Sequence, residues 1–240
     1  PHYPFQGPHD KPLRTVGQPG EIQGARTDKK AAYKEMVEAL DEGVGEIVSK
    51  LEELKLHENT MVWFMSDNGA ARQGSNQPLR GYKGGVWEGG HRVPSIASWP
   101  SVIPSSTETS LLTMTCDVMP TLLSIAEVEW DGHPPSDGTN VTPWLTEPSR
   151  TPESLSERAL FWNGTAMRQG PWKLIQTRAT PAPRYQLFHL EQDLSETRNI
   201  SDQYPDRVKS MRRALNAWKV AVEQSRASQP SDAAKKTSNN

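Results

Sequence analysis

The stretch Thr60–Pro100 reads TMVWFMSDNGAARQGSNQPLRGYKGGVWEGGHRVPSIASWP. It opens with a short apolar run, Met61–Met65, which stops at the polar turn Ser66–Gly69. This pattern predicts a buried strand that delivers an acid and an amide at its end. In open α/β sheets, that end of a strand is where ligands bind. The stretch therefore predicts both the class of fold and the place of a site.

A basic, glycine-rich loop follows this turn. Its glycines allow the backbone to close around an anion, and they are Gly81, Gly84, Gly85, Gly89 and Gly90. Its candidate anion-binding cations are Arg80, Lys83, His91 and Arg92. A second apolar segment, Val93–Trp99, predicts a second strand. A carboxylate for a metal cation followed by an anion-binding loop is the plan of an ester hydrolase that acts on a charged oxyanion.

The composition excludes several classes of protein. The 240 residues suffice for one large domain or two modest ones. A net charge of -2 and a pI near 6.4 give no support to bulk nucleic-acid or membrane-surface binding. No run of about 18 apolar residues exists to span a membrane. The single cysteine, Cys116, excludes an internal disulfide and a cysteine-based zinc site, and we expect it to be a small buried side chain.

The first part of the chain predicts a loop and a helix. The segment PHYPFQGP at Pro1 has no methionine and no signal-peptide pattern, so we expect the carboxy-terminal part of a longer protein. Prolines and glycines through Gly24 predict an extended loop. An amphipathic helix, capped by Thr27 or Asp28, is expected to continue to Leu54 with one face buried.

The middle of the chain predicts a second helix and a connection. Asp117 is expected to cap a helix that runs to Ala126 and has Pro120 in its first turn. Residues 131–157 predict a loop with a short apolar anchor at Val141–Leu145.

The last part of the chain predicts a separate arrangement of short strands and one helix. Its short β-prone segments indicate an antiparallel sheet, at Ala159–Trp162, Thr165–Arg168, Trp172–Gln176 and Tyr185–Leu190. Apolar residues at helical spacing from Val208 to Val222 predict a terminal helix. The expected fold is therefore α/β, with a mixed sheet flanked by helices that is incomplete in this chain, plus a smaller C-terminal antiparallel sheet with a terminal helix. The expected boundaries are 1–150, 151–226 and a flexible tail at 227–240.

For both the turn and the loop, a purely structural role is an alternative to ligand binding. Asp67 and Asn68 place two oxygens at a strand end, which suits calcium or magnesium, but Asp-Asn-Gly is also a common turn. Lys83 and Arg92 can each bind a tetrahedral anion, whereas Arg92 can equally pair with Glu88 or Asp67 as structural support. The residues alone leave these alternatives open.

Taken together, these motifs resemble the sulfatase family, within the wider alkaline-phosphatase-like group. The most specific carriers are SDNG, LRGYKGG and WEGGHRVPSIASWP in the Asn59–Pro100 segment. Supporting matches are PHYPFQGP at the start, DVMPTLLSIA at Asp117–Ala126 and LFHLEQDLSETRNI at Leu187–Ile200, which is similar to the family's closing strand and D-x-x-E-x-x-N turn. The resemblance covers nearly the whole chain.

The resemblance implies roles for individual residues. Asp67 and Asn68 fall where the family supplies two oxygen ligands to a divalent cation, usually calcium and sometimes magnesium. Lys83 falls on the lysine that holds a sulfate oxygen and assists the leaving group. His2 matches the histidine of the family's H-x-P segment, which also contacts the sulfate or the leaving oxygen. Arg92 lies in the E-G-G-x-R-x-P turn, where we expect a structural role.

One departure from the family pattern concerns the nucleophile. The family uses a formylglycine made from the Cys or Ser of a C/S-x-P-x-R motif, and this chain contains no such motif. Cys116 precedes Asp117-Val118-Met119 and does not match it. The formylglycine and two further acidic metal ligands are therefore expected upstream, in the N-terminal half of the same protein. That half is the expected partner of these residues. Residues 1–240 alone are expected to be inactive.

The resemblance implies a sulfuric ester hydrolase that releases sulfate from an aryl or carbohydrate sulfate ester. It also implies a periplasmic, secreted or lysosomal compartment. One alternative is a phosphomonoesterase or phosphodiesterase of the same superfamily, which a comparison of sulfate-ester and phosphate-ester turnover distinguishes. Another is a non-catalytic remnant of a degenerate sulfatase, which predicts no metal binding. The individual substrate and the oligomeric state are not determined by the residues.

Overall fold

The computed structural model describes residues 5–10, 26–131, 136–149 and 158–228. The chain divides into two compact units. The first comprises residues 1–77, 82–85 and 89–151, and the second comprises 78–81, 86–88 and 152–240. The glycine-rich segment around residue 81 therefore contributes residues alternately to both units.

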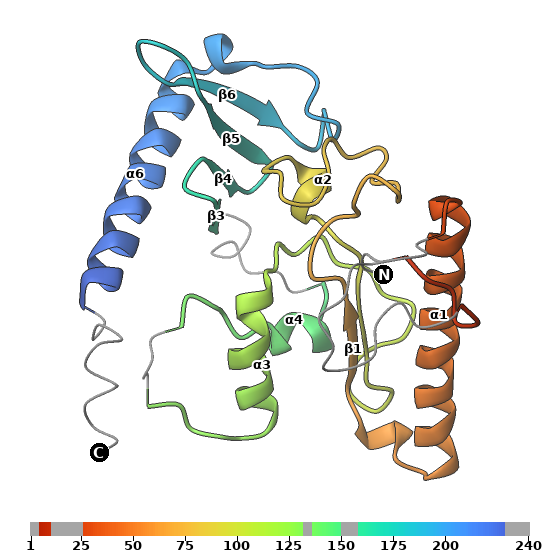
Figure 1. The fold of residues 1–240 in the computed structure, drawn as a ribbon. Helices are drawn as coiled ribbons and strands as arrows, with labels where there is room; N and C mark the ends of the chain where they lie inside the picture. Colours follow the sequence, from red (N-terminus) through yellow and green to blue (C-terminus); the bar gives the residue numbers. More distant parts are fainter. Residues whose placement is uncertain (1–4, 11–25, 132–135, 150–157, 229–240) are drawn as a thin grey trace, which may run out of the picture. The chain divides into compact units, whose positions relative to one another are not determined.

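The first unit contains helices and one pair of strands (Figure 1). Its elements are α1 (Lys29–Glu53), η1 (His57–Asn59), β1 (Val62–Met65), β2 (Ser95–Ser98), η2 (Thr115–Asp117), α3 (Val118–Ile125) and α4 (Thr142–Thr146). Strands β1 and β2 pair antiparallel, with Val62 opposite Ser98 and Met65 opposite Ser95. The short helix α2 (Glu88–His91) begins in the second unit and ends in the first.

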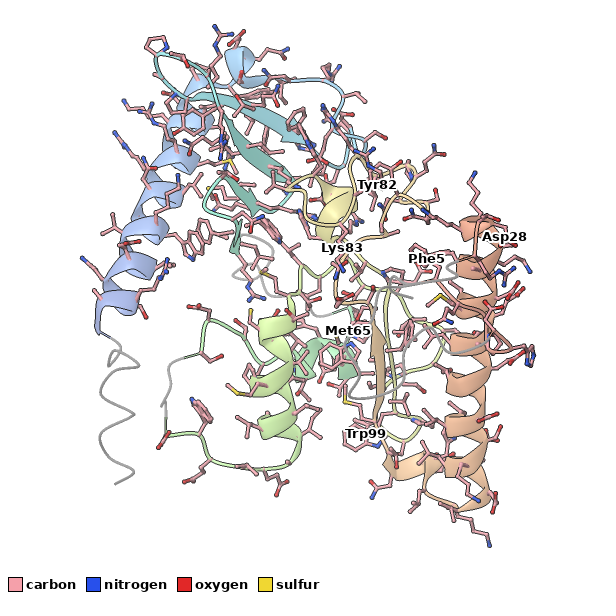
Figure 2. The ribbon with its side chains drawn as sticks, viewed as in Figure 1. Phe5, Asp28, Met65, Tyr82, Lys83 and Trp99 are labelled. Atoms are coloured by element: carbon pink, nitrogen blue, oxygen red, sulfur yellow. The ribbon has the colours of Figure 1, made fainter. Side chains whose placement is uncertain are left out.

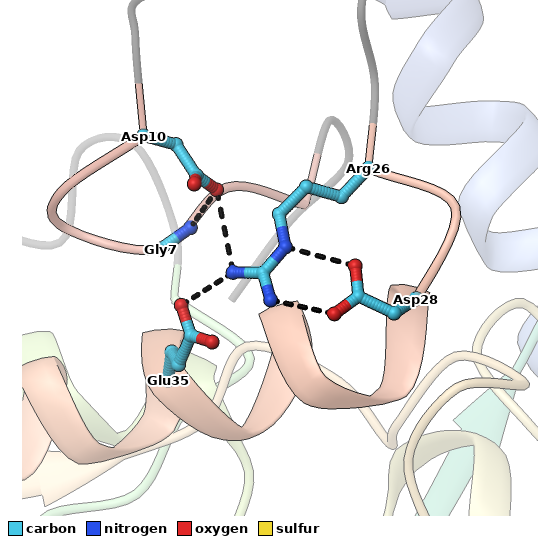
Figure 3. Close-up of polar contacts among 5 residues, drawn as sticks. All are labelled: Gly7, Asp10, Arg26, Asp28 and Glu35. Carbon is cyan, nitrogen blue, oxygen red and sulfur yellow. Dashed lines mark hydrogen bonds and ion pairs between the residues drawn. The ribbon is translucent and has the colours of Figure 1, made fainter.

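One arginine, Arg26, joins the loop before α1 to the start of that helix through several acidic residues (Figure 3). Arg26 forms ion pairs with Asp28 (2.6 Å), Glu35 (2.5 Å) and Asp10 (3.5 Å), and the Asp10 carboxylate also accepts from the amide of Gly7 (2.8 Å). Asp28 stands at the expected N-cap position, but its side chain makes no capping hydrogen bond. The hydrogen bond from Arg26 instead lowers the pKa of the Asp28 carboxyl. The expected helix is present, but Asp28 serves the loop rather than the helix end.

The apolar faces of the first unit are largely exposed. In α1 only Ala32 is buried, and Leu40 and Ile47 on the expected core face are 45% and 59% exposed. In the strand pair, Phe64 and Ile96 are also exposed. The expectations of a buried strand and a buried helix face are therefore wrong for the described residues. A two-stranded sheet offers too little apolar surface to cover both.

Asp117 holds the loop that leads into α4. It is fully buried, and its carboxylate accepts from the amides of Met114 (2.7 Å) and Thr139 (2.8 Å). It stands at the N-cap of α3 but makes no side-chain cap there, which corrects the expected role. The apolar anchor expected in this region is confirmed, because Val141 and Trp144 are buried in and beside α4.

Cys116 is exposed, contrary to the expectation of a buried side chain. The close packing at this position involves the backbone: a Cβ on Gly138 would lie 1.9 Å from the carbonyl oxygen of Cys116. Glycine at position 138 is therefore required for the approach of the two segments, and the thiol is not part of it.

The second unit is an antiparallel sheet covered by a long helix (Figure 1). Its elements are β3 (Ala159–Trp162), β4 (Ala166–Gln169), β5 (Trp172–Thr177), β6 (Arg184–His189), η3 (Ser201–Gln203) and α6 (Pro205–Ser228). The strands pair in sequence order, β3-β4-β5-β6. The helix begins at a proline, which suits the first turn, and extends beyond the apolar pattern that predicted it.

Both faces of this sheet are covered. On one face, Leu174 and Leu187 pack with Met211 and Leu215 of α6 in a buried core. On the other face, the neighbouring strand residue Ile175 belongs to a second cluster, which also includes Trp87 from the glycine-rich segment. The α/β class with a C-terminal antiparallel sheet and terminal helix is confirmed. No helix among the described residues is long and apolar enough to cross a membrane.

Candidate functional site

The predicted metal-binding turn stands at the end of β1. After Met65, labelled in Figure 2, the hydroxyl of Ser66 donates to the carbonyl oxygen of Asn68 (2.9 Å) and closes a tight turn. Asp67 lies at the exposed corner of this turn, and Asn68 is half-buried. The strand therefore delivers both side chains where the sequence predicted them.

This turn is joined to the glycine-rich loop through the main chain. The amide of Gly69 donates to the carbonyl oxygen of Gly90 (3.0 Å), and the amide of Lys83 donates to the carbonyl oxygen of Ala70 (3.1 Å). A Cβ on Gly69 would lie 1.9 Å from the carbonyl oxygen of Gly89, so only glycine permits this approach. The structure therefore brings the Asp67 turn and the Lys83 loop together through main-chain hydrogen bonds.

Lys83 sits on a tight turn of its own. The amide of Gly85 donates to the carbonyl oxygen of Tyr82 (2.9 Å), and Gly84 adopts a φ of 84° that favours glycine. Tyr82 and Lys83 are both exposed and are labelled in Figure 2. The turn holds the Lys83 backbone while its ammonium group faces solvent.

The side chains of Asp67, Asn68 and Lys83 have the chemistry of a site. Within the described part of the chain, no hydrogen bond or ion pair engages them. A carboxylate and an amide oxygen suit a hard divalent cation, and an ammonium suits an anionic oxygen. Calcium takes about six to eight oxygen ligands. The described residues hold no cluster of three or more His, Cys, Asp or Glu fit for a metal, so Asp67 and Asn68 can provide only part of a coordination shell.

The other cations of the loop have different places. His2 lies outside the described residues. Arg92 is exposed at the end of α2. Arg80 is not a free anion-binding group: its guanidinium lies 3.6 Å from the ring centre of Trp87 and donates to the carbonyl oxygen of Glu196 (2.8 Å). The expectation that Arg80 helps to bind an anion is therefore replaced by a packing role.

A buried charge network in the second unit was not predicted. Glu88 receives Lys173 on one carboxylate oxygen (2.8 Å) and Arg168 on the other (3.0 Å). Lys173 also lies 3.2 Å from Glu196, whose second oxygen accepts from the amide of Glu88 (2.7 Å). Glu88, Lys173 and Glu196 are fully buried. Glu88 therefore has two cationic partners some 80 residues further along the chain. The alternative that pairs Arg92 with a nearby acid stays a prediction.

The D-x-x-E-x-x-N motif shapes the turn that carries Glu196. The Asp193 carboxylate accepts from the amides of Thr197 (3.0 Å) and Arg198 (2.8 Å), and Asn199 accepts from the amide of Leu187 (3.0 Å). Burial alone would raise the pKa of Asp193, but these hydrogen bonds lower it. In the sequence, the only indication of this network is that Glu88 and Glu196 are acids that stand next to turn residues. No local pattern shows that they meet.

Known proteins match this chain in sequence and in structure. Residues 1–128 match the sequence model of the family described as Sulfatase. A protein named Sulfatase from Formosa agariphila is 34% identical over 221 residues, which are 79% of this chain and 40% of that protein. The N-acetylgalactosamine-6-sulfatase of Sus scrofa is 36% identical over 142 residues, 57% of this chain and 26% of that protein.

A solved structure extends the comparison to three dimensions. The crystal structure of Ps i-CgsB in complex with k-i-k-neocarrahexaose matches with a TM-score of 0.71 and 29% identity. The match covers 80% of this chain and 44% of that one. The chain therefore spans less than half the length of each of these relatives.

Proposed function

Because this chain belongs to the sulfatase family, we propose that it supplies one wall of the active site of a sulfuric ester hydrolase. Asp67 and Asn68 provide two oxygen ligands of a divalent cation, with calcium preferred and magnesium as the alternative. Lys83 binds a sulfate oxygen. The observation that supports this assignment is the main-chain clamp between the Asp67 turn and the Lys83 loop, which groups a metal-binding pair and a cation.

The chemistry of the reaction fits these residues. Hydrolysis of a sulfate ester breaks the bond between sulfur and the ester oxygen, and water supplies the oxygen and protons that complete sulfate and alcohol. A bound divalent cation offsets negative charge on the sulfate oxygens. The Lys83 ammonium donates a hydrogen bond to the sulfate and to the ester oxygen as negative charge grows there. His2 is proposed to assist at the same leaving oxygen.

The nucleophile is proposed to come from outside these 240 residues. The chain contains no C/S-x-P-x-R motif, so we assign the formylglycine, and the remaining acidic metal ligands, to a preceding part of a longer parent protein. Residues 1–240 alone are then catalytically silent. A periplasmic, secreted or lysosomal compartment is part of the same proposal.

A sulfated carbohydrate is the proposed class of substrate, with aryl sulfates as the alternative. Two relatives support the carbohydrate class by their own names: one is an N-acetylgalactosamine-6-sulfatase, and the other was crystallised with neocarrahexaose.

The test uses the full-length parent protein with an aryl sulfate and the matching phosphate ester. Lys83→Ala is expected to lower kcat/KM for the sulfate ester by about 100- to 1,000-fold, since it removes a donor to developing charge. Asp67→Ala is expected to abolish calcium binding in a calorimetric titration. Arg72→Ala, which removes an exposed cation between these two residues, is the control and should change neither. Faster turnover of the phosphate ester, or a measurable rate from residues 1–240 alone, would contradict the proposal.

A second variant tests the clamp itself. Gly69→Ala leaves Asp67 and Lys83 intact but forces a methyl group against the carbonyl oxygen of Gly89. The turn and the loop must then separate, so we expect a loss of kcat/KM of at least about tenfold, because misplacement by about 1 Å can cost up to 100-fold. Gly43→Ala in α1, where a Cβ meets no atom, is the matched control. Equal activity of the two variants would show that the clamp is not needed.

A further inference from the structure

We propose that Glu196 is a positioning residue for Lys83, because it binds both stems of the short loop that carries this lysine. The inference rests on the proposed function for its catalytic consequence. Its structural basis is independent of that function, since the contacts that fasten the two stems lie within the second unit.

Each stem of the loop is fastened to a different group of Glu196. The first stem ends at Gly81, and its Arg80 guanidinium donates to the Glu196 carbonyl oxygen (2.8 Å). The second stem begins at Val86, and the amide of Glu88 donates to the Glu196 carboxylate (2.7 Å). Main chain and side chain of one residue thus hold the two ends of the same loop.

The stems are also fastened to each other and to the sheet. The Arg80 guanidinium lies over the Trp87 ring (3.6 Å), so the first stem packs on the second. Trp87 in turn meets Phe188 of β6 edge-on, with ring centres 5.6 Å apart. The stems are therefore held by Glu196 and by Trp87 on the face of the sheet that carries Phe188.

Glu196 has little freedom to move. Its side chain is fully buried beside Lys173 (3.2 Å), and shifting a buried carboxylate away from its partner is costly. Its φ of 51° is in the left-handed region, which is unusual for a residue other than glycine. The residue lies in the turn that Asp193 and Asn199 hold through hydrogen bonds. Strain of this kind persists where the surroundings determine the backbone, and it is concentrated at functional positions.

Only Tyr82–Gly85 lie between the stems. A four-residue loop with both ends fixed has few conformations, and an internal hydrogen bond from Gly85 to Tyr82 reduces them further. Lys83 is the cation on this loop. Holding the stems therefore restricts the two ends of the loop that carries Lys83, without any contact between Glu196 and the reacting atoms.

The test combines two measurements on the full-length parent protein. Amide hydrogen exchange of the peptide covering residues 79–88 reports whether the loop is held, and kcat and KM on an aryl sulfate report the consequence. For Glu196→Ala we expect at least tenfold faster exchange and about tenfold lower kcat, with KM changed less than about twofold. Glu196→Gln keeps an oxygen for the Glu88 amide and should restore most of both. Glu191→Ala, an exposed acid nearby, is the control.

The two measurements separate positioning from bulk stability. A Glu196→Ala protein that unfolds earlier, yet has the control's loop exchange and kcat when folded, would refute the inference. If Glu196→Ala does not fold, Arg80→Ala releases only the first stem, and it should change exchange and kcat in the same direction by a smaller factor; no change in either would refute the inference. If the wild type hydrolyses no sulfate ester, the proposed function fails, while the exchange measurement still decides whether Glu196 holds the loop.

Discussion

The two units of this chain differ in how they bury apolar surface. Among the described residues, most buried apolar side chains belong to the second unit, and most large exposed ones belong to the first. Strands β3–β6 and α6 enclose cores on both faces of one sheet. In α1, by contrast, Leu40 and Leu54 remain about half exposed. The second unit has the packing of a completed fold, whereas the first presents apolar faces without cover in the described residues.

The units also treat charge in opposite ways. In the second unit, Glu88, Lys173 and Glu196 are buried and bound to one another. In the first, Asp67 and Lys83 are exposed, and the main chain around them provides the order. The residues proposed for chemistry are thus held by backbone hydrogen bonds and glycines, while the buried charges serve to hold structure.

Lys173→Met should have the largest effect, because it leaves two buried carboxylates facing each other. Removing one partner of a buried ion pair costs roughly 3–5 kcal/mol. We expect a decrease of that size in the free energy of unfolding of the second unit, measured by urea denaturation followed by tryptophan fluorescence. Lys209→Met on the exposed side of α6 is the control. A loss below about 1 kcal/mol would mean that the network contributes little to stability.

A matched pair of leucine substitutions tests the difference in burial directly. Leu174→Ala removes a fully buried side chain from the core beneath α6 and should cost about 2–5 kcal/mol in the free energy of unfolding. Leu40→Ala removes a side chain that is 45% exposed in a helix, where alanine is favourable, and should cost less than about 1 kcal/mol. Chemical denaturation of residues 1–240 measures both. Equal costs would contradict the contrast between the two units.

The smallest expected effect is a dependence on pH. Burial raises the pKa of Glu196 above its ordinary value of 4.5, despite the neighbouring Lys173. The folded state then binds more protons than the unfolded state as pH rises above 4.5, so the free energy of unfolding falls until the raised pKa is passed. The stability advantage of wild type over Glu196→Gln should thus be largest at low pH and shrink as pH rises. An advantage that grows with pH, in denaturation curves across this range, would show the opposite sign.

Local sequence patterns predicted the helices and strands well in the second unit, where elements close together in the sequence pack on one another. The four strands of the second unit and its terminal helix appear close to the predicted positions, because alternating and helical spacing report directly on burial there. The same reasoning failed for α1, whose apolar spacing is present but whose Leu40 face is exposed. Spacing indicates that a face can be buried, and it contains no information on what covers it.

The proposed site was predictable in part. Asp67, Asn68 and Lys83 were visible as an acid, an amide and a cation beside glycines. The contacts of Arg80 with Trp87 and Glu196, and those of Glu88 with Arg168 and Lys173, were not predicted. Ion pairs between residues 80 or more positions apart leave no periodic trace in a sequence.

Local spacing and motifs such as SDNG and WEGGHRVP were enough to identify the family, the strands and longer helices in order, and the residue types available for chemistry. Three features follow only from the folded chain: Gly69 must be glycine, Asp117 holds a distant loop, and Glu196 binds both stems of the Lys83 loop. The reason is physical. A backbone approach or a buried charge pair depends on segments far apart in the chain, and it exists only once they have been folded together.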